Sequence, residues 1–144
     1  MKMDSLKRFE DAQENMYQIA LKEIVNGKKE SHWMWYIFPQ LRGLGYSHMA
    51  YTYGINGVEE AKAYLAHPVL SARLIEITEA LLIHKEKPIE DILGNIDSMK
   101  LRSSMTLFAS ISEAGSVFHR VIESFYDNEP DEATLKLLLN RSYR

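Results

Sequence analysis

Apolar side chains recur at helical spacing near the N-terminus. Between residues 6 and 24 they return about every 3.6 positions, with charged residues between them, at Leu6, Phe9, Met16, Ile19, Ala20 and Ile24. This pattern predicts one amphipathic helix that buries its apolar stripe. Asp4 or Ser5 suits the start of that helix, and Gly27 suits its end.

The same spacing returns from residue 58 to the end of the chain and predicts a series of shorter helices. Gly57 or Asn56 begins the first of them, Pro68 suits the first turn of the second, and Gly94 stops the third. Asp97 and Asp131 are suitable N-caps for two later ones. The predicted ranges are 58–66, 68 through at least 82, 89–94, 98–112, 116–126 and 132 onward.

Residues 32–57 do not follow the helical pattern. The stretch His32–Phe38 is short and rich in rings, so it fits either a strand or a short buried helix, and Pro39 ends it. Residues 42–57 contain four glycines and are predicted to form a structured loop. The predicted fold is therefore all-α: a compact bundle of about seven helices with one aromatic, glycine-containing insertion. Residues 1–144 form a single domain with its core at about 5–139.

Composition excludes several classes of protein. An apolar fraction of 46% and a charged fraction of 26% are typical of a globular chain. The net charge of −3 gives no basic surplus for phosphate neutralisation, so no nucleic-acid partner is expected. There is no cysteine, no signal-peptide pattern and no apolar run of membrane-spanning length, so we expect a cytoplasmic protein without a membrane partner.

The insertion holds the first group of candidate binding residues. Gln40 and Arg42 lie among glycines that let backbone N–H groups approach a ligand, and Arg42 can pair with a carboxylate or phosphate. Trp35 can stack on a planar ring. His32 and His48 are candidate acid–base groups, because histidine titrates near neutrality. The alternative is that the rings belong to the core and the glycines to turns.

A second group lies on the helix predicted at 98–112. With Leu101, Met105 and Phe108 inward, Lys100, Ser103 and Ser104 lie on an adjoining face. The serines also suit close helix packing, and the Lys100–Ser104 spacing does not match the known Ser-Lys nucleophile signature. His84 and His119 lie in polar surroundings and are predicted to face solvent. The sequence has no metal-binding pattern and no phosphate loop, so neither metal nor cofactor is expected.

Several stretches of the chain are similar to domain of unknown function family 1810, a bacterial and fungal family. They are HWMWYIFPQLRGLG at 32–45, EEAKAYLAHPVLSARL at 59–74, KLRSSMTLF at 100–108 and DEATLKLL at 131–138. Ser71 departs from the family pattern, where glycine is usual. The resemblance implies a mostly helical single domain and little about function. Some members carry the label calpastatin, a disordered inhibitor, which this globular composition does not support.

A fainter likeness, over about 100–138, is to the NADAR families that process ADP-ribose-linked metabolites. Two hypotheses follow. The first is a pocket for a small anionic, nucleotide- or ADP-ribose-like ligand between the 32–53 segment and the 100–106 helix, with catalysis undecided. The second is a protein-interaction module or a homodimeric structural domain without catalysis. An exposed apolar patch favours the second, and a closed polar-lined hollow favours the first.

Overall fold

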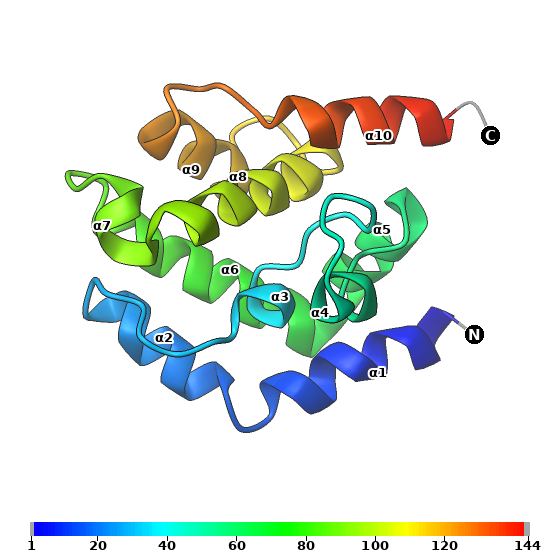
Figure 1. The fold of residues 1–144 in the computed structure, drawn as a ribbon, viewed down its shortest axis with the longest axis horizontal. Coiled ribbons are helices and arrows are strands. Elements are labelled where there is room, and N and C mark those ends of the chain that lie inside the picture. The colour runs from blue at the N-terminus through cyan, green and yellow to red at the C-terminus, as the bar shows by residue number, and fades with distance from the viewer. Residues whose placement is uncertain (1, 143–144) are drawn as a thin grey trace.

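The computed structural model describes residues 2–142, and over this range the chain is mainly helical (Figure 1). Ten helices follow one another, where about seven were predicted. They are α1 (Lys2–Gln13), α2 (Tyr17–Val25), α3 (Met34–Ile37), α4 (His48–Thr52), α5 (Val58–Ala66), α6 (Pro68–Leu82), α7 (Ile89–Leu93), α8 (Asn95–Ser110), α9 (Val117–Phe125) and α10 (Glu132–Ser142).

The helices pack in layers on either side of α6. Figure 1 shows α6 through the middle of the molecule, with α1 and α2 on one side and α8, α9 and α10 on the other. Packed pairs agree with this view: α2 and α5 contact α6, α9 contacts both α6 and α8, and α10 contacts α8. No helix within residues 2–142 is long and apolar enough to cross a membrane.

A path of aromatic rings runs through the core. Phe9 packs edge-on against Tyr64 with ring centroids 5.2 Å apart, and Tyr64 lies 5.5 Å from Phe108. Phe108 in turn lies 5.6 Å from Phe118. The path joins α1, α5, α8 and α9, so helices from both halves of the chain share one hydrophobic core.

The first predicted helix is two helices. α1 ends at Gln13 and α2 begins at Tyr17, with a turn in which the N–H of Met16 donates to the carbonyl of Gln13. Ser5 is not the cap, because α1 starts earlier and the Ser5 hydroxyl donates to Glu60. Ile19 was predicted to be inward but is 45% exposed, because the break changes the face that α2 buries. The side chain of Asp4 lies outside the described part.

The later helices match the sequence prediction more closely. α5 has the predicted bounds, α6 begins at Pro68 and α7 ends just before Gly94, as predicted. The Asp131 carboxylate caps α10 by accepting the N–H of Thr134 at 2.9 Å. Asp97 is not a cap: α8 begins at Asn95, and the Asp97 carboxylate pairs instead with Lys29 at 2.8 Å. Val69 was assigned to an apolar stripe but is 42% exposed.

Residues 32–57, which include the predicted insertion, contain two short helices. The ambiguous His32–Phe38 stretch contains α3, and the predicted loop contains α4, whose cap is Ser47. A single bridge closes the base of this loop: the N–H of Arg42 donates to the carbonyl of Ile55 at 2.8 Å, and the N–H of Ile55 to that of Gln40 at 2.9 Å. Residues 40 and 55 are therefore held together.

A buried ion pair fixes this loop to α1. The Arg8 guanidinium donates to both oxygens of Glu60, at 3.0 and 3.1 Å, and to the carbonyls of Thr52 at 2.7 Å and Gly54 at 2.8 Å. The side chains of Arg8 and Glu60 are only 20% and 9% exposed. We call Ser5, Arg8, Thr52, Gly54 and Glu60 the Arg8 cluster. The Arg8 guanidinium provides hydrogen-bond donors for two loop carbonyls that have no partner within a helix or sheet of the described chain.

A second carboxylate holds the chain between α2 and α3. Glu23 accepts hydrogen bonds from the N–H groups of Glu30 at 2.8 Å and Ser31 at 3.0 Å, from the Ser31 hydroxyl at 2.6 Å and from the Trp33 indole at 2.9 Å. Trp33 is fully buried. This carboxylate therefore holds the segment that leads from α2 into α3.

Replacing Gly54 with alanine is expected to disturb the loop, because the backbone is too close there for a side chain. An added Cβ would lie 2.7 Å from the Cα of Arg42 and 2.8 Å from the carbonyl oxygen of Ala50. We expect a loss of about 1–3 kcal/mol in the free energy of unfolding, measured by urea denaturation. Gly57→Ala is the matched control, because its Cβ would meet nothing within 4 Å and its φ of 164° is extended. We expect the control to change stability by less than about 1 kcal/mol; equal losses would contradict the close-approach argument.

Stability is expected to fall in acid because of Glu23 and Glu60. Burial by itself would raise both pKa values, but the hydrogen bonds to each carboxylate outweigh it and lower the pKa of each to about 2. In the unfolded chain these groups bind protons at an ordinary pKa of about 4.5. The unfolded state therefore takes up protons first as the pH falls, and the contribution of each group to stability is present above about pH 4.5 and is lost between about pH 4.5 and 2. Urea midpoints at pH 7, 5, 4 and 3 measure this, and Glu60→Gln should flatten the profile.

Candidate functional site

A pocket of about 320 Å³ opens between residues 40–45 and α8. Its polar lining comes from Gln40, Lys100, Ser103 and Asp131. Its apolar lining comes from Leu44, Ile96, Met99 and Ala133, with Gly45 beside them. We call this the Lys100 pocket. The Lys100 pocket lies between the 32–53 segment and the 100–106 helix, where the first hypothesis predicted a pocket.

Lys100 brings the positive charge to this pocket. Its amine lies over the Trp35 ring, 4.2 Å from the centroid, and 3.7 Å from the Asp97 carboxylate. Asp97 has a shorter contact with Lys29, at 2.8 Å, whose side chain is 8% exposed. Two cations thus share one carboxylate, and the Lys29–Asp97–Lys100 group keeps a net charge of +1. The Lys100 amine, which lines the pocket, can therefore donate a hydrogen bond to an anionic ligand as well.

Three further polar side chains line the same pocket. The described part of the chain offers no hydrogen-bond partner for the Gln40 side-chain amide, and the Ser103 hydroxyl donates to the carbonyl of Met99 at 3.2 Å, leaving its lone pairs as acceptors. Asp131 brings the opposite charge: one carboxylate oxygen accepts from Thr134, and the other is open to a hydroxyl or amine. The lining of the pocket therefore carries charges of both signs.

The other predicted site residues lie outside the lining. Arg42 lies over the Tyr51 ring at 4.7 Å and donates to the Tyr51 carbonyl at 3.0 Å, so α4 draws the guanidinium away from the pocket. Ser104 is fully buried, and its hydroxyl has no hydrogen-bond partner in the described chain. Trp35 lies beneath Lys100 and touches the site through that amine.

Neither predicted catalytic histidine reaches the pocket. His32 is exposed just before α3, and His48 is exposed at the start of α4, where its ring lies 3.5 Å from the Thr52 hydroxyl. Their catalytic role stays a prediction. Among the residues whose side chains the structure describes, no three or more His, Asp or Glu side chains are grouped so that they could hold a metal ion.

Sequence reasoning missed the apolar lining and Asp131. Ile96 and Met99 precede Lys100 and Ser103 by one helical turn each, so helical spacing alone could have placed them on the same face. Asp131 was assigned only as a helix cap, which it is, but the cap also sets its carboxylate at the pocket.

Comparison with known proteins gives a family and a fold. A family model described as "Protein of unknown function (DUF1810)" matches residues 3–138. Among solved structures, the chain is similar to the conserved hypothetical protein Rv1873 from Mycobacterium tuberculosis, with 45% sequence identity and a TM-score of 0.91, over 93% of this chain and 96% of that chain. A search of curated proteins found no match.

Proposed function

This chain belongs to the DUF1810 family of proteins of unknown function, and we propose that it binds a small anionic ligand in the Lys100 pocket. The observation that carries the proposal is the position of the Lys100 amine, held on Trp35 at the edge of a hollow between two segments distant in sequence. A cation preset over a ring binds an anion without first losing its own side-chain freedom.

The lining limits the ligand further. A phosphate or carboxylate group pairs with Lys100, while a hydroxyl or amine donates to the open oxygen of Asp131. The apolar side chains of Leu44 and Met99 lie beside a ring or sugar face. At about 320 Å³ the pocket is at the small end of the usual range for ligand sites. A sugar phosphate or a single nucleotide therefore fits better than a whole ADP-ribose, which would extend beyond the pocket.

Arg42 has a lesser part in this proposal. Its guanidinium adds positive potential from the neighbouring loop, and Gln40 orients the ligand from the same loop. The proposal is one of binding: in the described chain no imidazole lines the Lys100 pocket.

A thermal-shift screen tests the proposal, with ribose 5-phosphate, AMP, NAD and ADP-ribose as probes. A probe at 100 times its dissociation constant adds about 2.7 kcal/mol of stability, which raises the Tm by roughly 5–10 °C for a chain of this size. Lys100→Met keeps an apolar stem on Trp35 and removes the charge, so we expect at least tenfold weaker binding. Arg42→Gln, the matched control, should weaken binding about threefold or less. An unchanged Tm with every probe, or equal binding by Lys100→Met, contradicts the proposal.

The second candidate is the interaction module. Ile96 and Met99, at the lip of the pocket, are 71% and 70% exposed, and apolar side chains grouped in this way favour a protein contact. Sedimentation of the wild type and of Ile96→Ser separates the two functions. Self-association that Ile96→Ser abolishes, together with a flat ligand screen, would favour a homodimer through this face.

A further inference from the structure

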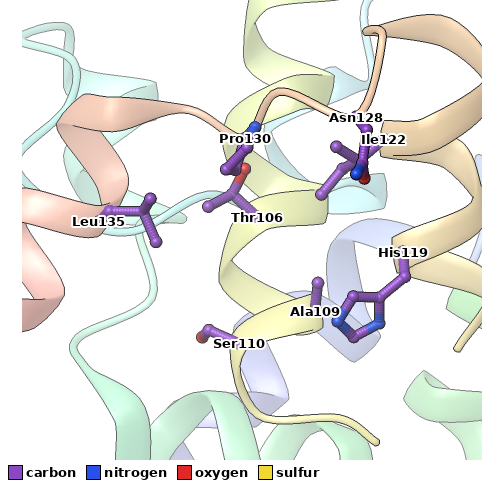
Figure 2. A pocket seen from close by; sticks show the side chains of 8 residues that line it. All are labelled: Thr106, Ala109, Ser110, His119, Ile122, Asn128, Pro130 and Leu135. Carbon is purple, nitrogen blue, oxygen red and sulfur yellow. The ribbon is translucent and has the colours of Figure 1, made fainter. Parts of the chain in front are cut away.

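A second hollow is lined in part by the segment that joins α9 to α10. It has a volume of about 200 Å³ and opens between α8, α9 and α10 (Figure 2), and Lys100 is not among the residues that line it. Ala109, Ile122 and Leu135 give it an apolar floor and side, and Ser110, His119 and Asn128 contribute polar groups. We call it the His119 groove. No Lys, Arg, Asp or Glu side chain of the described chain lines it.

His119 was predicted to face solvent, but its ring lies in this groove. Figure 2 shows the imidazole extending from α9 toward Ala109 and Ser110 on α8. The Ser116 hydroxyl lies 2.7 Å from Nδ1, so that nitrogen has its partner. No group of the described residues bonds to Nε2 or to the Asn128 side-chain amide. Both are therefore open to a molecule that enters the groove.

The wall beside Asn128 is set before any ligand binds. Asp127 and Asn128 have φ values of 54° and 60°, a left-handed conformation that costs energy in residues other than glycine and that Asn and Asp tolerate best. Two hydrogen bonds fix the rest of the segment to α8: Arg102 donates to the carbonyl of Glu129 at 2.8 Å, and the N–H of Asp131 donates to the Thr106 hydroxyl at 2.8 Å. The groove keeps its shape because its third wall is anchored.

We propose that the His119 groove is a second binding site, for a small uncharged single-ring compound that carries a hydroxyl or an amide. A cavity of about 150 Å³ is large enough for a benzene-sized ring, so about 200 Å³ takes one ring with a polar substituent. The apolar floor takes the face of the ring. A hydroxyl or an amide both donates and accepts, so it pairs with Nε2 in either tautomer and with the Asn128 amide. A charged ligand would meet no Lys, Arg, Asp or Glu side chain of the described residues in this lining.

Titration with four probes, followed by NMR at the His119 ring protons, tests this proposal. Phenol and benzamide should shift these signals along saturable curves, with dissociation constants on the order of 1 mM. Toluene, which has the ring without the polar group, should bind at least fivefold more weakly. Benzoate, which has the charge, should not saturate below 10 mM.

Two variants that fill the groove complete the test. Leu135→Trp places a large side chain at a position that is 40% exposed, so the fold should tolerate it, and Ala109→Met fills the floor. Either variant should abolish the phenol shifts, whereas Lys100→Met should leave them as in the wild type, which keeps this site separate from the Lys100 pocket. No saturable shift with phenol or benzamide overturns the proposal, and so do toluene binding as tight as phenol or phenol binding that survives in Leu135→Trp.

Discussion

Arg8→Ala is expected to lower the free energy of unfolding by about 3–5 kcal/mol, the largest loss among the variants considered. The substitution leaves the Glu60 carboxylate, 9% exposed, without its cation, and leaves the carbonyls of Thr52 and Gly54 without their donor. A buried charge that has lost its partner lowers the free energy of unfolding by more than the intact ion pair raises it. Urea unfolding at pH 7 measures the loss.

Controls from the same helix sharpen this prediction. Lys7 pairs with Asp11 at 3.3 Å on the exposed side of α1, so Lys7→Ala removes a charge of the same sign and should cost less than about 0.5 kcal/mol. The double variant Arg8→Met with Glu60→Leu should lose less stability than Arg8→Ala, because no charge is left unpaired. Similar losses for Arg8→Ala and Lys7→Ala would show that the buried pair does not hold the loop.

Glu23→Ala is expected to cost about 2–4 kcal/mol. Four donors lose their acceptor, and one of them is the indole N–H of the fully buried Trp33. A buried donor without a partner costs about 1–3 kcal/mol, and hydrogen bonds to a charged acceptor are the stronger kind. The loss is measured from the shift of the urea midpoint, together with faster hydrogen exchange at the Trp33 indole.

An exposed carboxylate provides the comparison for Glu23. Glu79 lies exposed on α6, and Glu79→Ala should change stability by less than about 0.5 kcal/mol. Glu23→Gln keeps one acceptor oxygen, so its loss of stability should lie between those of Glu79→Ala and Glu23→Ala. If Glu23→Gln is as stable as the wild type, the negative charge contributes nothing to the junction of α2 and α3.

The helices from residue 58 onward follow from the sequence because their boundaries are marked locally. Pro68 opens α6, Gly94 precedes α8, and Ser116 and Asp131 cap α9 and α10 with their own side chains. Local hydrogen bonds and fixed backbone angles act within a few residues, so a single sequence records them.

The break between α1 and α2 could not be predicted in this way. Apolar positions continue at helical spacing across it, and neither proline nor glycine marks it. Gln13 explains the difference: it is a buried polar residue whose amide donates to the carbonyl of Tyr36 at 2.8 Å and to the Tyr64 hydroxyl at 3.0 Å. Both partners are more than twenty residues away, so only the folded chain shows why α1 ends there.

For the candidate site, too, some residue positions could be predicted from the sequence and others could not. Gln40, Lys100 and Ser103 meet at one hollow, as the sequence suggested from two clusters of polar residues. Arg42 does not line it, because its contacts depend on α4, which the sequence presents as a glycine-containing loop. The position of a side chain in a loop depends on distant backbone atoms, and no local pattern records those.

The two tryptophans allow the most direct test of the Lys100 pocket. Trp35 lies under the Lys100 amine, whereas the Trp33 indole is buried and bonded to Glu23, so one indole N–H signal reports on the pocket and the other on the fold. We would titrate ¹⁵N-labelled protein with AMP and with ribose 5-phosphate and follow both signals. We predict that Trp35 shifts along a saturable curve, that Trp33 stays in place, and that Lys100→Met removes the Trp35 shift. A Trp35 signal that does not move with either compound, or that moves equally in Lys100→Met, would contradict anion binding at this pocket.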